Sequence, residues 1–237
     1  MKNLKIIAIV LLSFCFMTKV YSQRSISVHV GPSFPLSEFG LSKMIDEDSE
    51  EVITNAGGAA IGLNGGLQYV YTFSKIGLGV FGGVDFNYNG LQKSSRRDFE
   101  RIFEEDGIDD IKIEYYKYVN VPLTVGLNYT YQGDGMIGVF ANAGVALNLL
   151  KMTNMKLSSE IEDEAFKVKM DLASNFGFKA GAGILFAKKY FVSIDYFGLG
   201  KHEIDVEIKE MGLMELIVGF DIERKVDLLT VSLGIKF

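Results

Sequence analysis

The chain has 237 residues, with 24 Lys and Arg against 30 Asp and Glu, so its formal net charge is −6. This acidic balance, without a basic run in the sequence, argues against nucleic acid as a partner. The composition combines 26 Gly, 18 Phe and 11 Tyr with 3 Pro and no Trp, which suits strands that end in aromatic residues. Beyond the N-terminus no apolar run reaches the length of a membrane-spanning helix, so helical spans are not expected.

The N-terminus has the pattern of a secretory signal peptide. Lys2 and Lys5 precede an uncharged apolar run over residues 6–17, and Val20 and Ser22 stand where a signal peptidase requires small residues. The run is shorter than the about 20 residues of a spanning helix. An uncleaved anchor and a lipoprotein signal at Cys15 are the alternatives, and Phe14 argues against the second. We therefore expect residues 1–22 to be removed and residues 23–237 to form one domain without cysteine.

Residues 59–73 show which structure this domain adopts. Their odd positions are mostly apolar, including Leu63 and Leu67, whereas their even positions are small or polar, including Gly66 and Gln68, and the stretch contains no charge. A period of two indicates a strand. A soluble strand would carry charges on its polar face, and such small side chains cannot fill a core. The pattern therefore predicts an apolar face toward lipid and a small polar face toward the lumen of a narrow closed barrel.

The same alternation recurs along the rest of the chain. We expect strands near residues 25–34, 59–73, 77–88, 111–129, 137–149, 175–186, 190–197 and 229–237. Long acidic segments alternate with very short turns between them, and both termini fall on the short-turn side. The sequence thus predicts an all-β fold, an eight-stranded antiparallel transmembrane β-barrel with up-and-down meander topology. Its location would be the bacterial outer membrane, with both mature termini in the periplasm.

Several irregularities are also expected. Phe99, Ile102 and Phe103 have helical spacing within a long loop, which predicts a short surface helix. Pro122 cannot donate to a strand ladder, so we expect a bulge there.

The last strands extend the alternation into the charged segments. Ile204 and Val206 continue the outward phase of their strand, so we expect hairpins that rise above the membrane into water. The alternation breaks between Ile222 and Leu229, which predicts a bulge or bend near Arg224 and Lys225.

A small set of charged residues falls on the predicted lumen face. These residues are His29, Asp85, Lys179, Asp195 and Lys236. Lys179 lies diagonally opposite Asp195, within reach of a cross-strand ion pair. This pair either neutralises buried charge or forms an ionic gate, and His29 is either a hydrogen-bonded lumen residue or a proton sensor. An eight-stranded barrel has room for side chains or one small ligand, which disfavours a general diffusion porin.

Catalytic and metal-binding residues are not expected. The acidic stretches at residues 46–51 and 160–164 lack the spacing of a calcium loop, so they are interpreted as solvated loop charge that cations could bridge to lipopolysaccharide phosphates. His202 is the histidine placed near the outer rim, and no serine lies beside it in the sequence, so we expect a solvated side chain. The chain is therefore predicted to be no enzyme and to need no cofactor.

Short motifs resemble a known family. Residues 31–40 (GPSFPLSEFG), 118–123 (YVNVPL), 141–148 (ANAGVALN) and 181–184 (GAGI) are similar to strands of the PorT-like outer-membrane β-barrels of the Bacteroidota. This resemblance implies an eight-stranded barrel of the OmpA type. The C-terminal residues 231–237 look like the assembly signal that the barrel-insertion machinery reads. Its outward side chains would be Val231, Leu233, Ile235 and Phe237.

The expected function is correspondingly broad. An integral outer-membrane protein with a structural, adhesive or envelope-assembly accessory role fits best. The expected partners are outer-membrane lipid and lipopolysaccharide, the barrel-insertion machinery during assembly, and an envelope protein complex. A narrow channel or small-ligand carrier is the first alternative, and an outer-rim lipid-modifying enzyme is the second.

Overall fold

The computed structural model describes residues 23–42, 56–73, 77–105, 111–132, 135–159, 165–210 and 217–237. The expected signal peptide and the acidic stretches at residues 46–51 and 160–164 lie outside these described residues. Among the described helices, none has the length and hydrophobicity that crossing a membrane requires.

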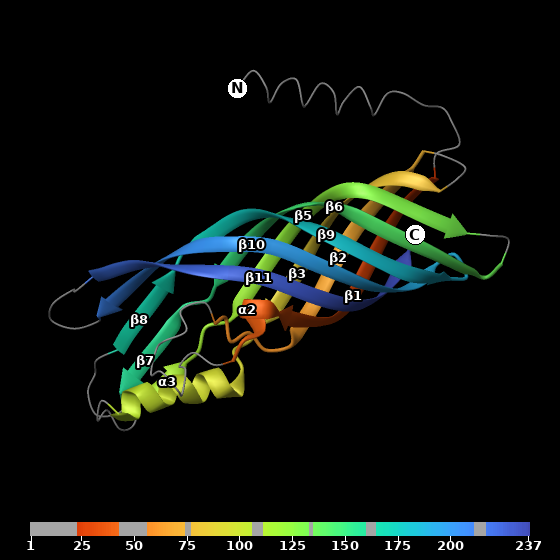
Figure 1. The fold of residues 1–237 in the computed structure, drawn as a ribbon. Helices are drawn as coiled ribbons and strands as arrows, with labels where there is room; N and C mark the ends of the chain where they lie inside the picture. Colours follow the sequence, from red (N-terminus) through yellow and green to blue (C-terminus); the bar gives the residue numbers. More distant parts are fainter. Residues whose placement is uncertain are drawn as a thin grey trace, which may run out of the picture.

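Eight long antiparallel strands form a closed ring. They are β1 (Gln23–Leu36), β2 (Gly62–Thr72), β3 (Leu78–Asn89), β5 (Tyr118–Gln132), β6 (Ile137–Met152), β9 (Leu172–Phe186), β10 (Tyr190–Glu210) and β11 (Ile217–Lys236). Each strand pairs with the next in this series, and β11 pairs with β1, with Val28 opposite Ile235. The predicted eight-stranded meander barrel is therefore confirmed (Figure 1).

The two ends of the barrel differ. The C-terminus and short connections such as the turn at residues 187–189 lie at one end (Figure 1). At the other end lie α2 (Ser37–Gly40), α3 (Lys93–Glu105), β4 (Ile111–Glu114), β7 (Met155–Ser159) and β8 (Ala165–Met170). The helix expected around Phe99 is present as α3. The strand expected at residues 111–129 is instead divided into β4 and β5, which pair with different neighbours.

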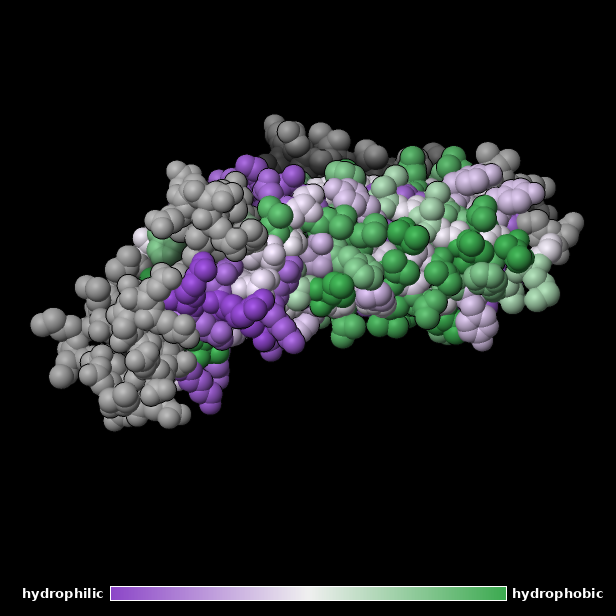
Figure 2. Space-filling model, turned by 60° about the horizontal axis from the view of Figure 1, so that its bottom comes forward, coloured by the Kyte–Doolittle hydropathy of each residue, from purple (hydrophilic) through white to green (hydrophobic). Residues whose placement is uncertain are grey.

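The barrel wall is apolar on its outside. Val30, Leu63 and Leu127 each leave 60% or more of their surface exposed, and similar side chains cover the wall in Figure 2. Exposed apolar area on this scale is not compatible with water around a soluble monomer. Because the ring leaves no unpaired edge in the wall, the strands can cross lipid with their backbone groups satisfied. The outward face is therefore the lipid face of a transmembrane barrel.

The one register shift in the β10–β11 pairing lies in β10. Gly198 pairs with Asp227 and Gly200 with Val226, so Leu199 is an extra residue. Gly200 has a φ of 77°, a left-handed conformation that glycine adopts without strain. The expected bulge at Arg224 and Lys225 is wrong, since alternate β11 residues from 224 to 232 stay buried without a change of phase.

The bulge reverses the faces of β10. Below it Asp195 and Phe197 point into the barrel, and above it His202, Ile204 and Val206 do so. Ile204 and Val206 were expected to continue the outward phase, but they are buried. The hairpin does rise beyond the barrel, yet its apolar face turns inward and packs into a core.

Pro122 produces no bulge. Val84 lies opposite Leu123 and Asn87 opposite Asn120, which is one unbroken register on either side of the proline. On its other edge Pro122 lies directly opposite Asn148. The ring tolerates a missing N–H donor here by omitting a local pair with β3 while leaving the strand spacing unchanged.

An apolar core fills the mouth at the long-loop end. Its buried members are Phe39, Ala59, Leu91, Tyr116, Tyr118, Ala146, Leu150, Met152, Met155, Leu157, Met170, Ala173, Phe197, Leu199, Ile204, Val206, Val226 and Leu228. Phe39 of α2 packs edge-on against Tyr118 with ring centroids 4.8 Å apart. Above the barrel, β11, β10, β8, β7 and β4 form one continuous sheet over this core.

Candidate functional site: a polar cluster in the lumen

His29 and Asp85 meet across three neighbouring strands. His29 lies on β1, Gly66 opposite it on β2, and Asp85 opposite Gly66 on β3. The His29 Nε2 atom lies 2.8 Å from Asp85 Oδ1. A Cβ at Gly66 would lie 2.6 Å from His29 Nε2 and 2.7 Å from Asp85 Oδ1. The contact therefore exists because residue 66 has no side chain.

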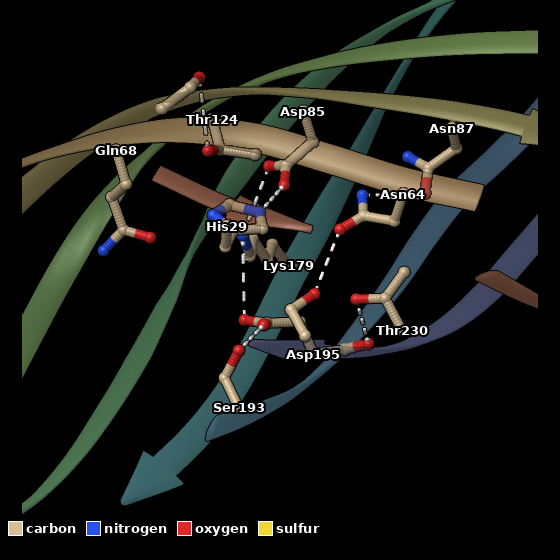
Figure 3. A network of polar contacts seen from close by, with 12 residues as sticks. His29, Asn64, Gln68, Asp85, Asn87, Thr124, Lys179, Ser193, Asp195 and Thr230 are labelled. Atoms are coloured by element: carbon tan, nitrogen blue, oxygen red, sulfur yellow. Dashed lines mark hydrogen bonds and ion pairs between the residues drawn. The ribbon is translucent and has the colours of Figure 1, made fainter. Parts of the chain in front are cut away.

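Lys179 connects this pair to Asp195. Its Nζ atom lies 3.2 Å from Asp85 Oδ2 and 3.6 Å from Asp195 Oδ1, so the predicted ion pair between Lys179 and Asp195 is present. Ser193 Oγ donates a hydrogen bond of 2.9 Å to Asp195 Oδ2. Lys179 Nζ also lies 4.8 Å from the ring centroid of Phe197. Figure 3 shows Asp85, Lys179 and Asp195 converging from opposite walls of the barrel.

A layer of amides and hydroxyls extends the cluster toward the long-loop end. Asn64 Nδ2 donates to Asn87 Oδ1 at 3.0 Å, and Ser232 Oγ donates to Asn64 Oδ1 at 3.1 Å. Sequence reasoning placed these residues on the lumen face without assigning them a contact. Their positions in the alternation were the available signal, but only the barrel's register shows which of them meet.

The charges of the cluster are buried and paired. Asp85 and Lys179 are each 2% exposed and Asp195 is 4% exposed. An unpaired charge at such depth would carry a large desolvation cost, so each carboxylate requires its cationic or hydroxyl partner. The cluster joins β1, β3, β9 and β10, and it fixes these walls relative to one another. Asp85 and Lys179 are thus almost inaccessible to solvent in this conformation.

A small cavity lies between the cluster and the short-turn end. His29, Asn142, Asp195 and Lys236 are among its lining residues, and its volume is about 40 Å³. At 10–15 Å³ per molecule, this volume holds roughly three waters. Lys236 therefore lines the same cavity as His29 and Asp195 but forms no ion pair with the cluster. The structure thus brings four of the five predicted charged residues into one network.

His202 is not a solvated loop residue as expected. The bulge turns it inward, where it is fully buried and its Nε2 atom lies 3.0 Å from Asn148 Nδ2. Burial lowers the pKa of His202, although the backbone near Arg224 and Gly200 opposes this effect. A neutral ring that accepts a hydrogen bond from Asn148 has a structural role. Because the ring is buried, this histidine has no exposed position from which to act on lipid.

The C-terminal residues lie on the lipid face. Leu233 and Phe237 are exposed, and Val231 and Ile235 are partly so. Phe237 also exchanges backbone hydrogen bonds with Ile26. Their place as an assembly signal stays a prediction. Within the described residues no group of three or more His, Cys, Asp or Glu is arranged to hold a metal ion.

Comparison with known proteins gives likeness of fold alone. No family model and no curated protein matches the chain. Neisserial surface protein A (NspA) is 10% identical over 91% of this chain and 97% of its own, with a TM-score of 0.47. A major outer membrane protein from Thermus thermophilus is 13% identical over 90% of this chain and 99% of its own, with a TM-score of 0.48. Ail, the attachment invasion locus protein of Yersinia pestis, is 17% identical over 90% of this chain and 97% of its own, with a TM-score of 0.37.

Proposed function

We propose that this protein is an integral outer-membrane barrel with a structural, adhesive or envelope-assembly accessory role. The barrel would anchor a folded surface cap, which consists of α2, α3, β4, β7 and β8. The observation that supports this role is the closed interior. A buried ionic cluster crosses the lumen, and an apolar core fills the mouth above it. Such a core would obstruct the passage of solutes through the barrel. It would, however, give a rigid base to a cap that contacts other molecules.

The orientation proposed is that of other barrels of this type. Short turns and both mature termini would face the periplasm, and the cap of α2, α3, β4, β7 and β8 would face outward. The upper sheet supports this placement because its outward face is charged, with Lys201 and Glu223 in an ion pair of 2.7 Å. Charged residues at this level belong in water beyond the lipid.

A pull-down from gently solubilised membranes tests the role. A tag inserted after Lys188, in the short turn at the opposite end from the cap, leaves the cap free. We expect a stable protein partner that is lost when the surface-exposed charges Lys201, Glu203 and Glu223 are reversed together. Recovery of the barrel alone, from wild-type and variant cells equally, contradicts an accessory role. A PorT-like identity stays a prediction from the short motifs, since no family model supports it.

A narrow channel is the second candidate, and the cavity beneath the cluster favours it. This cavity gives water a place in the short-turn half of the lumen next to His29 and Lys236. Opening would require the ion pairs of Lys179 to exchange and the core around Phe39 to move. Single-channel recordings in planar bilayers test this: steady conductance of the unmodified protein supports a channel, and its absence supports the anchor.

An enzymatic role is not proposed. The buried His202 contacts Asn148 rather than a hydroxyl or a carboxylate. Mass spectra of lipid A from cells that overproduce the protein give the check, and we expect them to match those of cells without it.

A further inference from the structure

The lipid boundary of the barrel can be located on β3 and β5. Outward side chains run from Leu78 to Tyr88 on β3 and from Tyr129 to Val119 on β5, and the two strands pair along this length. Ten residues rise about 33 Å along a strand, and a tilt of about 40° reduces this to about 25 Å, the height of the apolar band of such barrels. Tyr88 and Val119, which are paired, therefore mark the lipid boundary at the long-loop end.

Two basic side chains, those of Lys117 and Arg96, lie directly above this boundary. Lys117 immediately precedes β5, and its Nζ atom lies 5.7 Å from the ring centroid of Tyr88. Arg96 lies on the first turn of α3, where its Nε atom donates to the Leu91 carbonyl at 3.1 Å. Its Nη2 atom reaches to 3.9 Å from where a Cβ of Gly90, two residues after Tyr88, would lie. Lys93 and Arg97 of the same helix are also exposed.

Two nearby carboxylates have partners outside this group of basic residues. Glu100 accepts a hydrogen bond of 2.7 Å from Tyr115, and Glu114 pairs with Lys156 at 3.4 Å. Within the described part of the chain, none of Lys93, Arg96, Arg97 and Lys117 takes part in an ion pair. These four residues, the rim cluster, belong to a protein whose net charge is −6.

We propose that the rim cluster binds the phosphate of an anionic lipid headgroup in the leaflet at the long-loop end of the barrel. The guanidinium of Arg96 offers paired N–H donors to a phosphate, and Lys117 adds a point charge beside it. The ring of Tyr88 and the side chain of Val119 continue downward as a surface for the acyl chain. Charge complementarity favours an anion, and the position at the boundary, next to the apolar wall, favours a lipid over a soluble anion.

The hydrophilic surface agrees with this placement. Figure 2 shows hydrophilic side chains gathered at the edge of the apolar band, on the side of the long-loop end. Sequence reasoning found no basic patch because the cluster combines a helix with a residue about twenty positions further along the chain. The fold brings Lys117 and Arg96 to the same rim. The inference does not depend on the accessory role, since an anchor and a channel both need lipid contacts.

The test is lipid binding by the folded barrel in a neutral detergent, measured by native mass spectrometry. The probes are a short-chain phosphatidic acid, a diacylglycerol with the same chains, and inorganic phosphate. We expect phosphatidic acid to bind and diacylglycerol not to. Each basic residue near a charged surface contributes about fivefold, so the double variant R96Q/K117Q is expected to lose about 30-fold in affinity.

A matched control is available at the other end of the barrel. Lys189 lies 6.0 Å from the ring of Tyr190, a similar cation–aromatic contact without a second helix-borne cation. The variant K188Q/K189Q removes equal charge and is expected to keep the affinity within about twofold of the unmodified protein, as two exposed lysines outside the rim cluster contribute little. The variant K93Q/R97Q serves as a second probe of the rim cluster should R96Q/K117Q fail to fold.

Three outcomes decide the matter. Selective loss in R96Q/K117Q, or in K93Q/R97Q if it is needed, supports the proposal. Equal affinity in the rim and control variants overturns it. Competition by inorganic phosphate at the same concentration as phosphatidic acid also overturns it, because the cluster would then be a site for soluble anions rather than lipid.

Discussion

Inward-facing glycines decide where the polar side chains of the lumen can meet. Gly66 leaves the space in which His29 and Asp85 form their contact. Gly181 does the same for Asp195, whose Oδ1 atom occupies the position that a Cβ would take. In a barrel as narrow as this one, the space left by one absent methyl group is enough to accommodate a carboxylate oxygen. Residues without side chains are thus part of the ionic cluster.

Replacing Gly66 by alanine should disrupt the cluster. The new methyl group would overlap both His29 and Asp85, and overpacking of this kind costs on the order of 1–3 kcal/mol. Urea unfolding of the barrel in detergent measures the loss. Gly65→Ala is the matched control, since its Cβ would meet only the His29 carbonyl oxygen at 3.6 Å. Equal unfolding midpoints for the two variants would show that the space at Gly66 is not required.

Removing Lys179 should cost more than any surface lysine. Lys179→Met leaves Asp85 and Asp195 buried without their shared cation, and an uncompensated buried charge costs about 3–5 kcal/mol. The triple variant that also carries Asp85→Asn and Asp195→Asn should recover much of this loss. The urea midpoint again reports stability, with Lys188→Met as an exposed control. A midpoint unchanged by Lys179→Met would mean that the ion pairs are not formed in the membrane.

At the scale of the element, β10 shows how one residue redirects a whole segment. The extra residue Leu199 turns Ile204 and Val206 from the lipid side of the strand to the interior of the cap. Deleting Leu199 should restore the simple alternation and expose this apolar face. We expect the cap to become sensitive to protease while the barrel strands stay protected, and peptide mapping after limited digestion distinguishes the two. Equal protection of the cap in both proteins would contradict this role of the bulge.

The same element explains which parts of the fold the sequence could predict. Alternation placed most of the barrel strands and their faces correctly because lipid and lumen impose opposite polarities at every second residue. Above the membrane both environments change, and an apolar face turns inward instead of outward. The alternation of Ile204 and Val206 is the same in either case, so their direction depends on the bulge. For His202 the sequence showed acidic neighbours, whereas the turned strand buries it.

The outward face of this hairpin carries carboxylates directly opposite one another. Asp205 faces Asp221 across β10 and β11, and hydrogen bonding to Asp221 raises the pKa of Asp205 above its usual value. The folded hairpin therefore holds a proton more tightly than the unfolded chain does. Its stability is greatest below the unfolded pKa of Asp205 and declines as the pH rises through the folded value.

Asp221→Asn should remove this pH dependence. Hydrogen exchange of the β10–β11 hairpin at neutral pH should become slower in the variant, because like charges no longer face each other. At a pH below about 3.5 both proteins should exchange alike once the acid-catalysed rate is corrected, since an aspartate is then largely protonated even in the unfolded chain. Glu203 faces Glu223 two pairs along the ladder from Asp205 and Asp221, so Glu203→Gln reports whether the effect is local.

At the scale of the whole molecule, the defining property is a polarity turned inside out. This property could be predicted from the sequence because every strand repeats it. A single residue that departs from the alternation does not obscure the pattern. The contacts of the candidate site are not repeated. Lys179 reaches Asp85 from the opposite wall across 94 positions of sequence, and that meeting depends on the register of all the strands between them. The residues of the site were predictable, but their network was not.

Arginine substitutions at two depths on one strand test the membrane placement directly. Val125 is outward and lies near the middle of the stretch between Val119 and Tyr129. Val125→Arg should cost about 2–4 kcal/mol in folding into a bilayer, whereas Val119→Arg at the boundary should cost about 0–1 kcal/mol. Guanidinium titrations of folding into lipid vesicles measure both. Equal costs would place the bilayer elsewhere on the barrel, and a larger cost at Val119 would move its midplane toward the cap and away from the rim cluster.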